Sequence, residues 1–315
     1  MAAAKRNQKK QSAKNGKRLP ILLVLVLIIG IVTYFRDDIP FIKSVPTDGS
    51  VSVYFLDVGQ GDSELIVTDT AAVLIDGGER TEGDTLLADF QQYGISKLDY
   101  VIASHPHTDH IGGLTVFLGM DPADSGVTVG TVITADVPDA DIPTTKTYEQ
   151  FLDNAEAHAE DVCFLSESME LDLGSATLQL IPSPIKSDAE TLNEYSICGL
   201  LTSGANTFFF TGDAGKQEEQ ALLAENLLPS QPVDVLKVGH HGSKGSSSTE
   251  FLQALHPTDA VISCGTGNSY GHPHQGAFER LKEVGCTIYR TDLDGTICIR
   301  SDGKALTIQT EAEAS

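Results

Sequence analysis

Residues 104–110 read Ser-His-Pro-His-Thr-Asp-His and hold three of the chain's nine histidines. The proline prevents a helix here and keeps the residue before it extended. In an extended segment residues two apart point to the same side, so His105 and His107 can bind one ion. Asp109 and His110, on a turn that follows, can reach a second ion. Imidazole and carboxylate ligands suit zinc, manganese or iron, so the segment predicts a metal site rather than a chance group of surface histidines.

The elements next to this segment must deliver it and hold it in place. The apolar run at 98–104 (LDYVIAS) predicts a strand that leads directly into the histidines. After them, Gly112-Gly113 leaves the backbone free to turn and to approach another segment closely. A loop of metal ligands after a buried strand is therefore the expected local structure.

The remainder of the chain alternates short apolar strands with helices. Further strands are predicted at 51–58, 63–69, 71–77, 177–181, 195–201, 206–213, 233–239, 259–265, 287–290, 296–300 and 305–310. Helices are predicted at about 81–93, 215–226, 246–255 and 275–285. Two groups of strand hairpins, each followed by helices, indicate a layered α/β domain rather than a doubly wound sheet.

The N-terminal part of the chain differs from the rest. Residues 1–18 hold seven Lys or Arg and no acidic residue, and residues 19–35 form an uncharged apolar run, LPILLVLVLIIGIVTYF. Its length is at the lower end of what a bilayer requires, about 17–25 residues. No small-residue cleavage pattern follows, which favours an uncleaved anchor over a signal peptide.

These features predict a domain plan and a location. We expect a basic cytoplasmic tail (1–18), a transmembrane anchor (19–36), a linker (37–49) and a globular body (50–310). Basic flanks stay in the cytoplasm. The chain would therefore sit in the cell membrane as a single-pass protein, bound through its N-terminal helix, with its body outside the cell.

Composition restricts what the body can bind. Residues 19–315 carry 14 basic and all 44 acidic residues, a formal charge of −30. A body this acidic repels polyanions over long range, so nucleic-acid binding would depend on a local site. The five cysteines form no CxxC pair, which argues against a thiolate metal site or a disulfide scaffold. We expect most of them to be small apolar residues within strands, with one disulfide as the alternative.

The segment HPHTDHIGG at 105–113 resembles the HxHxDH signature of the metallo-β-lactamase fold. Four more segments are similar, in the same order, to the ComEC-type hydrolase domain of late-competence, DNA-uptake proteins: 55–63 (FLDVGQGDS), 210–213 (FTGD), 237–243 (KVGHHGS) and 270–274 (YGHPH). The resemblance covers about residues 51–301 and implies an α/β fold, the four-layer αββα sandwich. It also implies two divalent metal ions, zinc or manganese. The chain has one apolar span instead of a multi-span channel, so the hydrolase is carried over and DNA import is not.

The resemblance assigns further ligands one at a time. Asp213 would bridge two metals. Of His240 and His241, one would ligate the second metal and the other would lie close to the leaving group. His241 is favoured as the ligand, because the Gly242-Ser243 loop leaves it free, and His240 as the acid or phosphate contact. Asp109 would both ligate a metal and orient the nucleophile.

One ligand expected from relatives is missing. Many of them place a further histidine before the strand that precedes Thr-Gly-Asp, where this chain reads Leu-Asn-Glu-Tyr-Ser at 192–196. The first metal would then be completed by Asn193 or by water. His158, in an acidic helix-like stretch, is expected to be exposed to solvent rather than to bind a metal.

Other polar residues are expected around the metals. Asp57, Gln60 and Asp62 would order the loop beside the ligands, because carboxylates often hold ligating imidazoles. The expected anion-facing surface for the substrate consists of Ser243, Lys244, Asn268, His272 and His274. For the two histidines of this set, which flank a proline, a structural role in a turn between strand and helix is the alternative.

Two metals beside a carboxylate and a water suit phosphodiester hydrolysis, because the ions offset charge on the non-bridging oxygens. The leading hypothesis is a membrane-tethered, outward-facing metal-dependent phosphodiesterase, foremost a nuclease on extracellular DNA. The acidic body weighs against tight duplex binding, so a small or cell-surface phosphoester of the phosphocholine type is the enzymatic alternative. A less favoured alternative is a non-catalytic metal-binding module.

Overall fold

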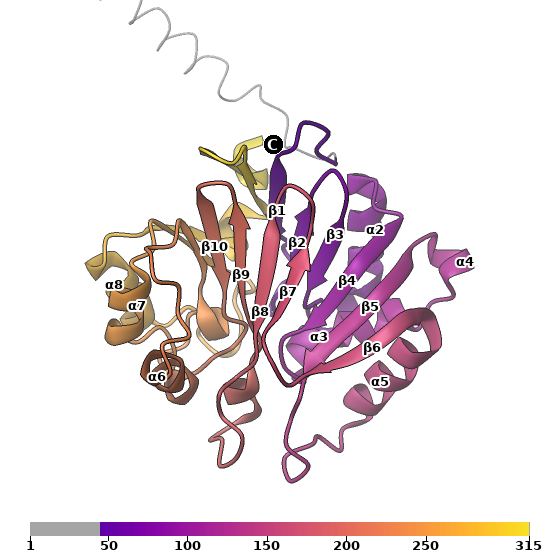
Figure 1. Cartoon of the computed structure of the whole chain (residues 1–315), viewed down its shortest axis with the longest axis horizontal. Coiled ribbons are helices and arrows are strands. Elements are labelled where there is room, and N and C mark those ends of the chain that lie inside the picture. Colours follow the sequence, from indigo (N-terminus) through magenta and orange to yellow (C-terminus); the bar gives the residue numbers. More distant parts are fainter. Residues whose placement is uncertain (1–44, 315) are drawn as a thin grey trace, which may run out of the picture. The chain divides into compact units, whose positions relative to one another are not determined.

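The computed structural model describes residues 45–314. The basic tail 1–18, the predicted anchor 19–36 and the first part of the predicted linker 37–49 lie outside the described residues. Within 45–314, no helix combines the length and the apolar character that a membrane span requires. Two large sheets with helices on their outer faces make up this part of the chain (Figure 1).

The first sheet has eight strands. In spatial order they are β15 (Leu306–Thr310), β14 (Ile297–Ser301), β1 (Val51–Phe55), β2 (Glu64–Val67), β3 (Ala72–Ile75), β4 (Lys97–Ala103), β5 (Thr128–Ala135) and β6 (Ala159–Leu165). The strands from β15 to β3 pair antiparallel, and those from β3 to β6 pair parallel. The second half of this sheet therefore has its carboxyl ends at one edge.

The second sheet has seven strands. In spatial order they are β13 (Thr287–Arg290), β12 (Asp259–Ile262), β11 (Val235–Lys237), β10 (Asn206–Phe210), β9 (Cys198–Ser203), β8 (Thr177–Ile181) and β7 (Met169–Asp172). The strands from β7 to β10 pair antiparallel, and those from β10 to β13 pair parallel. Each sheet thus combines an antiparallel and a parallel half.

The core lies between the two sheets. Along β1, Val53 and Phe55 point toward the second sheet, where the ring of Phe55 meets that of Phe210 with centroids 6.2 Å apart. The alternate residue Tyr54 points the other way and stacks on Tyr93 of the outer helix layer at 4.4 Å. This period-two pattern is what a strand buried on both faces requires. Full burial of each such side chain contributes about 1.5–3 kcal/mol.

Helices cover the outer face of each sheet. The first sheet is covered by α2 (Gly83–Tyr93), α3 (Thr108–Leu118) and α5 (Lys146–His158), and the second by α6 (Lys216–Ala224), α7 (Thr249–Leu255) and α8 (Gln275–Glu283) (Figure 1). Short helical turns are η2 (Arg80–Glu82), α4 (Pro122–Ser125), η3 (Leu192–Tyr195), η4 (Gly239–Gly242), α9 (Thr291–Asp294) and α10 (Glu311–Ala314). Helix, sheet, sheet and helix confirm the predicted αββα sandwich.

The cysteines behave as apolar residues, as the sequence predicts. All five are free. Cys163, Cys198 and Cys298 lie in strands β6, β9 and β14, and burial raises the pKa of the Cys198 thiol well above its usual range. Within the described residues, therefore, no disulfide links the two sheets.

Gly112 and Gly113 do not turn the chain, so that prediction is wrong. Both lie inside α3, whose first turn contains Asp109 and His110. The predicted close approach is present: a Cβ on Gly113 would lie 1.9 Å from the backbone oxygen of Gly77. The two glycines let the first turn of the helix pack directly against the loop that follows β3, and this fixes the position of the metal ligands.

Replacing Gly113 by alanine should therefore destabilise the fold by about 3 kcal/mol or more, because a backbone atom stands where the methyl group must go. Gly276→Ala is the matched control. It also lies within a helix, α8, but its nearest neighbour is 3.4 Å away on the flexible Arg280 side chain. That variant should gain up to about 1 kcal/mol. Urea unfolding of the metal-free protein measures the free energy of unfolding of both variants. Equal changes in this free energy for Gly113→Ala and Gly276→Ala would contradict the packing argument.

Candidate metal centre

Strand β4 ends at Ala103 and leads directly into the histidine segment. His107, the residue before α3, has an extended backbone, with φ −76° and ψ 150°. The Nε2 atom of buried His105 lies 3.1 Å from Nδ1 of His107. Ser104 Oγ donates to Asp76 and lies 3.0 Å from His105 Nδ1, so it accepts a hydrogen bond from the Nδ1–H of His105, and the lone pair of this ring is on Nε2. The structure thus places both imidazoles beside one common space.

The other half of the centre comes from the loops that follow β10 and β11. Asp213 is buried just after β10, and His240 and His241 lie in η4 after β11. The two histidines have φ angles of 49° and 54°, in the left-handed region that favours glycine. This conformation costs about 1–2 kcal/mol per residue. It turns both neighbouring rings toward one carboxylate, since their Nε2 atoms lie 3.8 and 3.5 Å from Asp213 Oδ2.

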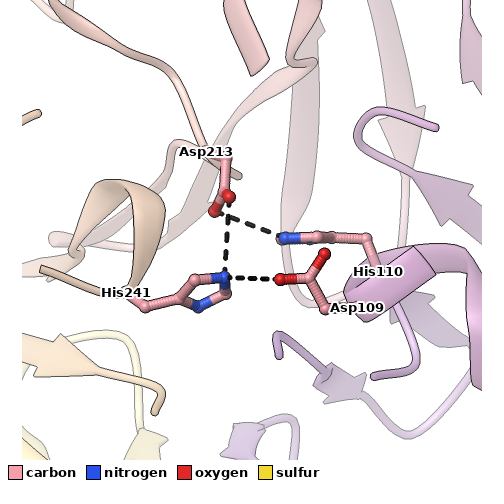
Figure 2. Close-up of side chains that lie close together, drawn as sticks. All are labelled: Asp109, His110, Asp213 and His241. Carbon is pink, nitrogen blue, oxygen red and sulfur yellow. Dashed lines mark ion pairs between the residues drawn. The ribbon is translucent and has the colours of Figure 1, made fainter. Parts of the chain in front are cut away.

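Four side chains form a compact group that could hold one ion: Asp109, His110, Asp213 and His241 (Figure 2). Their ligand atoms all lie within 4.8 Å of one another. His110 Nε2 is 3.3 Å from Asp213 Oδ1, and His241 Nε2 is 3.3 Å from Asp109 Oδ2. Asp213 comes from one sheet and Asp109 and His110 from the other, so the group forms only when the two sheets are packed.

The donor atoms of this group fit a divalent metal. Within residues 45–314, His110 Nε2, His241 Nε2 and Asp213 Oδ1 are buried and have no hydrogen-bond partner. Buried polar atoms are nearly always paired, so three such atoms pointing into one space indicate a bound species there. Two imidazole nitrogens with two carboxylates are a ligand set typical of divalent transition metals.

A second ion could lie on the other side of Asp213. Its Oδ2 atom is 4.0 Å from His105 Nε2, next to His107. Asn193 lies in the segment where the resemblance implies a further histidine, and its buried Oδ1 has no hydrogen-bond partner within 45–314. Its Nδ2 atom lies 3.0 Å from Nδ1 and 3.3 Å from Nε2 of His240. The free Oδ1 favours Asn193 as a ligand, and the roles of Asn193 and His240 stay predictions.

The sequence interpretation missed the group behind His110. Asp76 Oδ2 lies 2.8 Å from His110 Nδ1, and the same carboxylate accepts hydrogen bonds from the backbone and side chain of Ser104. A carboxylate behind a ligating histidine fixes the ring and makes it a better ligand. Asp76 lies near the end of the predicted strand 71–77. This strand pairs in parallel with the strand that leads into the histidines, so both strands end at the same edge of the sheet. That position could have identified Asp76 as a neighbour of the metal ligands.

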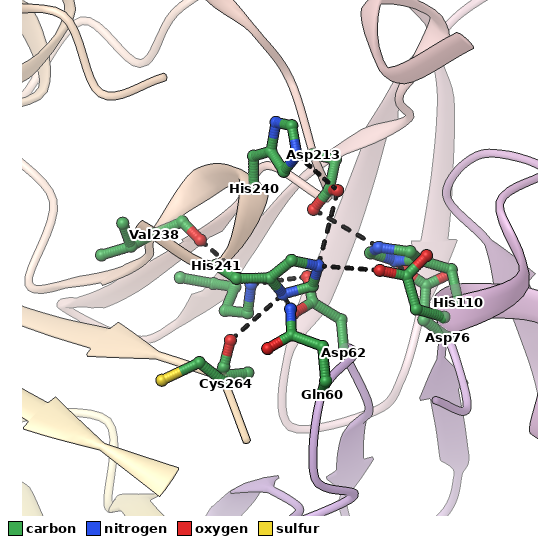
Figure 3. A network of polar contacts seen from close by, with 12 residues as sticks. Gln60, Asp62, Asp76, His110, Asp213, Val238, His240, His241 and Cys264 are labelled. Carbon is green, nitrogen blue, oxygen red and sulfur yellow. Dashed lines mark hydrogen bonds and ion pairs between the residues drawn. The ribbon is translucent and has the colours of Figure 1, made fainter. Parts of the chain in front are cut away.

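Asp62 lies behind His241 (Figure 3), and a buried lysine supports it. His241 Nδ1 donates to Ser263 O at 3.1 Å and lies 3.0 Å from Asp62 Oδ1. The other oxygen of Asp62 accepts from Lys237 Nζ at 2.5 Å, and both side chains are buried. Asp62 therefore occupies the place predicted for it, and Lys237 was not foreseen. The lysine compensates a carboxylate that burial would otherwise neutralise.

The charges of the site are strongly coupled. Burial opposes protonation of His241, but Asp213 and Asp62 outweigh it and raise its pKa to about 10. For His110, burial again opposes protonation, but the neighbouring Asp213 and Asp76 outweigh it and raise its pKa well above the usual value. Burial alone would raise the pKa of Asp213, yet the adjacent His241 and His110 hold it far below. Without a metal, the two protonated histidines thus balance the carboxylates.

Only one of the predicted substrate contacts lines the cleft above these residues. His272 does, and burial lowers its pKa to about 4. Asn268 holds the backbone of His272 through two hydrogen bonds of 2.7 and 2.9 Å. His274 precedes the first residue of α8, and its Nδ1 accepts from Lys244 N at 3.1 Å. This contact fits the alternative prediction of a structural role in a turn. Ser243 is buried and accepts from Gly245 N.

The Asp57 carboxylate accepts from Gly59 N within the loop that it was predicted to order. One further prediction needs correction. His158 is partly buried, with Nδ1 2.5 Å from Leu118 O at the end of α3, because the α5 end packs on α3. Gln60 lines the cleft and accepts from Gly265 N. Cleft residues that the sequence interpretation missed are Glu79, Thr108, Thr191 and Tyr270.

Comparison with known proteins agrees with this geometry. Residues 56–126 and 152–266 match the description "Metallo-beta-lactamase superfamily". These segments include every residue of the two candidate ligand sets. The chain belongs to the metallo-beta-lactamase superfamily. It is, in general terms, a metal-dependent hydrolase.

Relatives narrow the group further. The chain is 31% identical over 272 residues to "ComE operon protein 3" of Bacillus subtilis, covering 81% of this chain and 33% of that protein. It is 28% identical to "Competence protein ComA" of Neisseria gonorrhoeae, covering 87% and 34%. The chain thus spans about a third of the length of the curated relatives it matches. The ComEC-type resemblance is confirmed for this part.

A solved structure shares the fold. The metallo-beta-lactamase fold protein YhfI from Bacillus subtilis superposes with a TM-score of 0.54 at 17% identity, covering 80% of this chain and all of that one. At this identity the similarity concerns the fold alone.

Metal binding to the Asp109–His110–Asp213–His241 group should release two protons. His110 and His241 are protonated in the metal-free protein and must be neutral to bind. Protons compete with the metal at every pH below these raised pKa values, so affinity should rise with pH through the neutral range and level off only near pH 10, where His241 loses its proton. The rise should be up to about a hundredfold per pH unit, since two protons are displaced. Calorimetric titration in buffers of different ionisation enthalpy counts the protons, and a count near zero would contradict these protonation states.

Proposed function

We propose that this chain is a metal-dependent phosphodiesterase, foremost a nuclease that acts on extracellular DNA. The observation that carries the proposal is the buried Asp109–His110–Asp213–His241 group beside His105 and His107, at the floor of a cleft of about 450 Å³. A cleft of this size is large enough for a nucleotide and its phosphate. The competence proteins among the relatives support nucleic acid as the substrate.

The residues of the chain have separate tasks in such a reaction. Bound divalent ions would lower the pKa of a water molecule and offset charge on the phosphoryl oxygens. Asp109, whose side chain is 23% exposed, can accept a hydrogen bond from the attacking water and orient it. His240, 32% exposed, would lie close to the leaving oxygen. Burial lowers its pKa, so the neutral ring can donate one hydrogen bond there.

A second candidate substrate is a small or cell-surface phosphoester with a cationic head, such as a phosphocholine ester. The described residues that line the cleft include no Lys or Arg, but they include Glu79 and the 61% exposed Tyr270. An aromatic face and a carboxylate both attract a quaternary ammonium group. A direct comparison of the two substrates decides between them.

Hydrolysis of bis-p-nitrophenyl phosphate tests the enzymatic proposal without assuming the natural substrate. The full chain should cleave it with manganese or zinc, and chelation should abolish cleavage. Asp109→Asn should lower kcat/KM by about a hundredfold or more. Asp153→Asn, which removes the same charge from the exposed face of α5, should leave activity unchanged. The same proteins are then compared on plasmid DNA and on phosphocholine esters.

Other outcomes have clear meanings. Fewer than one bound metal per chain together with no hydrolysis would overturn the proposal. Bound metal without hydrolysis of any of these substrates would favour the non-catalytic metal-binding module. Equal cleavage of DNA by Asp109→Asn and the unaltered chain would identify a contaminating nuclease.

We also propose that residues 19–36 anchor the chain in the cell membrane, with the tail 1–18 in the cytoplasm and the body outside. The apolar run and its basic flank support this orientation. Protease added to intact cells should then remove the body while a cytoplasmic marker protein survives. Full protection of the body in intact cells, with digestion after permeabilisation, would refute the outward orientation.

A further inference from the structure

A second hollow, of about 190 Å³, contains three basic side chains: Lys216, Lys244 and Arg280. They come from the start of α6, from the loop after η4 and from α8. One carboxylate, that of Glu250, also lines the hollow, and the rest of its lining is serine, threonine and glycine. A concentration of positive charge is unexpected on a body that carries a formal charge of −30.

These three cations are not neutralised by ion pairs. Lys97, Lys237, Arg290 and Arg300 each face a carboxylate within 4.0 Å. Among the described residues, none of the three cations around the hollow has such a partner, although the buried Glu219 offsets part of the charge of Arg280. Unlike other unpaired lysines such as Lys146 and Lys304, these three cations line one hollow. They keep a local positive potential there, which suits an anionic ligand.

Backbone contacts fix the shape of the hollow. Arg280 donates to Ser246 O at 2.7 Å and to Ser247 O at 2.6 Å, so its guanidinium is held in place. Lys216 N donates to Gly245 O at 2.9 Å and joins the two loops that carry the lysines. A cation held before the ligand arrives loses less conformational freedom on binding.

The hollow and the cleft are lined by neighbouring segments of the chain. Lys216 lies three residues after Asp213, and Lys244 lies three residues after His241. Three residues span at most about 11 Å. Lys244 N also donates to His274, whose ring lies 4.9 Å from the cleft residue His272. A strand that occupies the cleft can therefore reach the hollow within roughly one to three nucleotides, at about 3.4 Å per nucleotide.

We propose that this hollow binds a phosphate next to the scissile one on the same substrate strand. The inference rests on the proposed phosphodiesterase and names its substrate class: a polymer with several phosphodiesters, such as a nucleic-acid strand, rather than a single phosphoester. The cleft itself contributes no Lys or Arg among its described lining residues. The neighbouring negative charges of a polymer therefore need cations outside the cleft, and the hollow supplies them.

The test measures binding of a fluorescent ten-residue oligothymidylate by anisotropy, with the full chain in detergent. The background carries Asp109→Asn, so that the strand is not cut. It also carries Gln at the seven basic residues of 1–18, so that the tail does not bind DNA. Lys216→Gln with Lys244→Gln should raise Kd about tenfold or more. It should also reduce the slope of log Kd against log salt by about 0.7, since each neutralised phosphate of a single strand contributes about 0.7 and the hollow binds one.

The control removes two equally exposed lysines elsewhere, Lys146→Gln with Lys304→Gln, and should leave Kd and the salt slope unchanged. Hydrolysis of bis-p-nitrophenyl phosphate is measured in parallel with Asp109 intact. The inference would be overturned if the two double variants lost binding equally. It would also be overturned if Lys216→Gln with Lys244→Gln left Kd unchanged, or if the background protein did not bind the oligonucleotide measurably. Loss of binding in that pair without any hydrolysis by the unaltered chain would contradict the phosphodiesterase and leave the hollow as a strand-binding site.

Discussion

The contact of the Asp213 carboxylate with imidazoles from both sheets is the interaction on which the rest of the structure depends. Asp213 follows β10 of the second sheet, whereas His105 and His110 follow β4 of the first. Its two oxygens face these rings at 4.0 and 3.3 Å. The centre therefore forms only when the apolar layer between the sheets is packed. A hydrophobic core of the usual density holds such distances to fractions of an ångström, and the fold in this way sets the geometry of the chemistry.

Burying so many charges requires compensation at each one. Asp76 and Asp62 orient His110 and His241 from behind, and Lys237 offsets the charge of Asp62. Removing one partner of a buried pair leaves an uncompensated charge and costs about 3–5 kcal/mol. The metal-free site keeps its balance by protonating the two histidines, and bound ions would take over that positive charge. The polar network is therefore one unit, in which ligands and their supports cannot be exchanged singly.

The sequence predicts the parts of this arrangement that depend on local patterns. The extended HPH segment follows from its proline and its spacing, and the strands and helices follow from apolar periodicity. Asp76 and Lys237 were missed because their roles arise from contacts between segments far apart in the chain. Gly112 and Gly113 were read as turn residues, since glycine is common in turns. Their cause is the backbone of residues 77–80, which only the packed structure brings close: Gly77 O faces Gly113, and Arg80 N faces Gly112. The roles of Asn193 and His240 depend on one side-chain contact, which no spacing rule contains.

The acidic body and a polyanionic substrate are compatible when the range of electrostatic forces is considered. At physiological ionic strength charges are screened beyond about 8 Å, so a strand responds mainly to the groups it touches. The carboxylates at the floor of the cleft are balanced by the protonated histidines or by bound ions. Lys216, Lys244 and Arg280 line one hollow together. Negative charge beyond the screening length opposes contact there only weakly, and it lowers the affinity for polyanions elsewhere on the surface. If the proposed phosphodiesterase activity holds, the same charge that weakens general DNA binding would direct a strand to the metal centre.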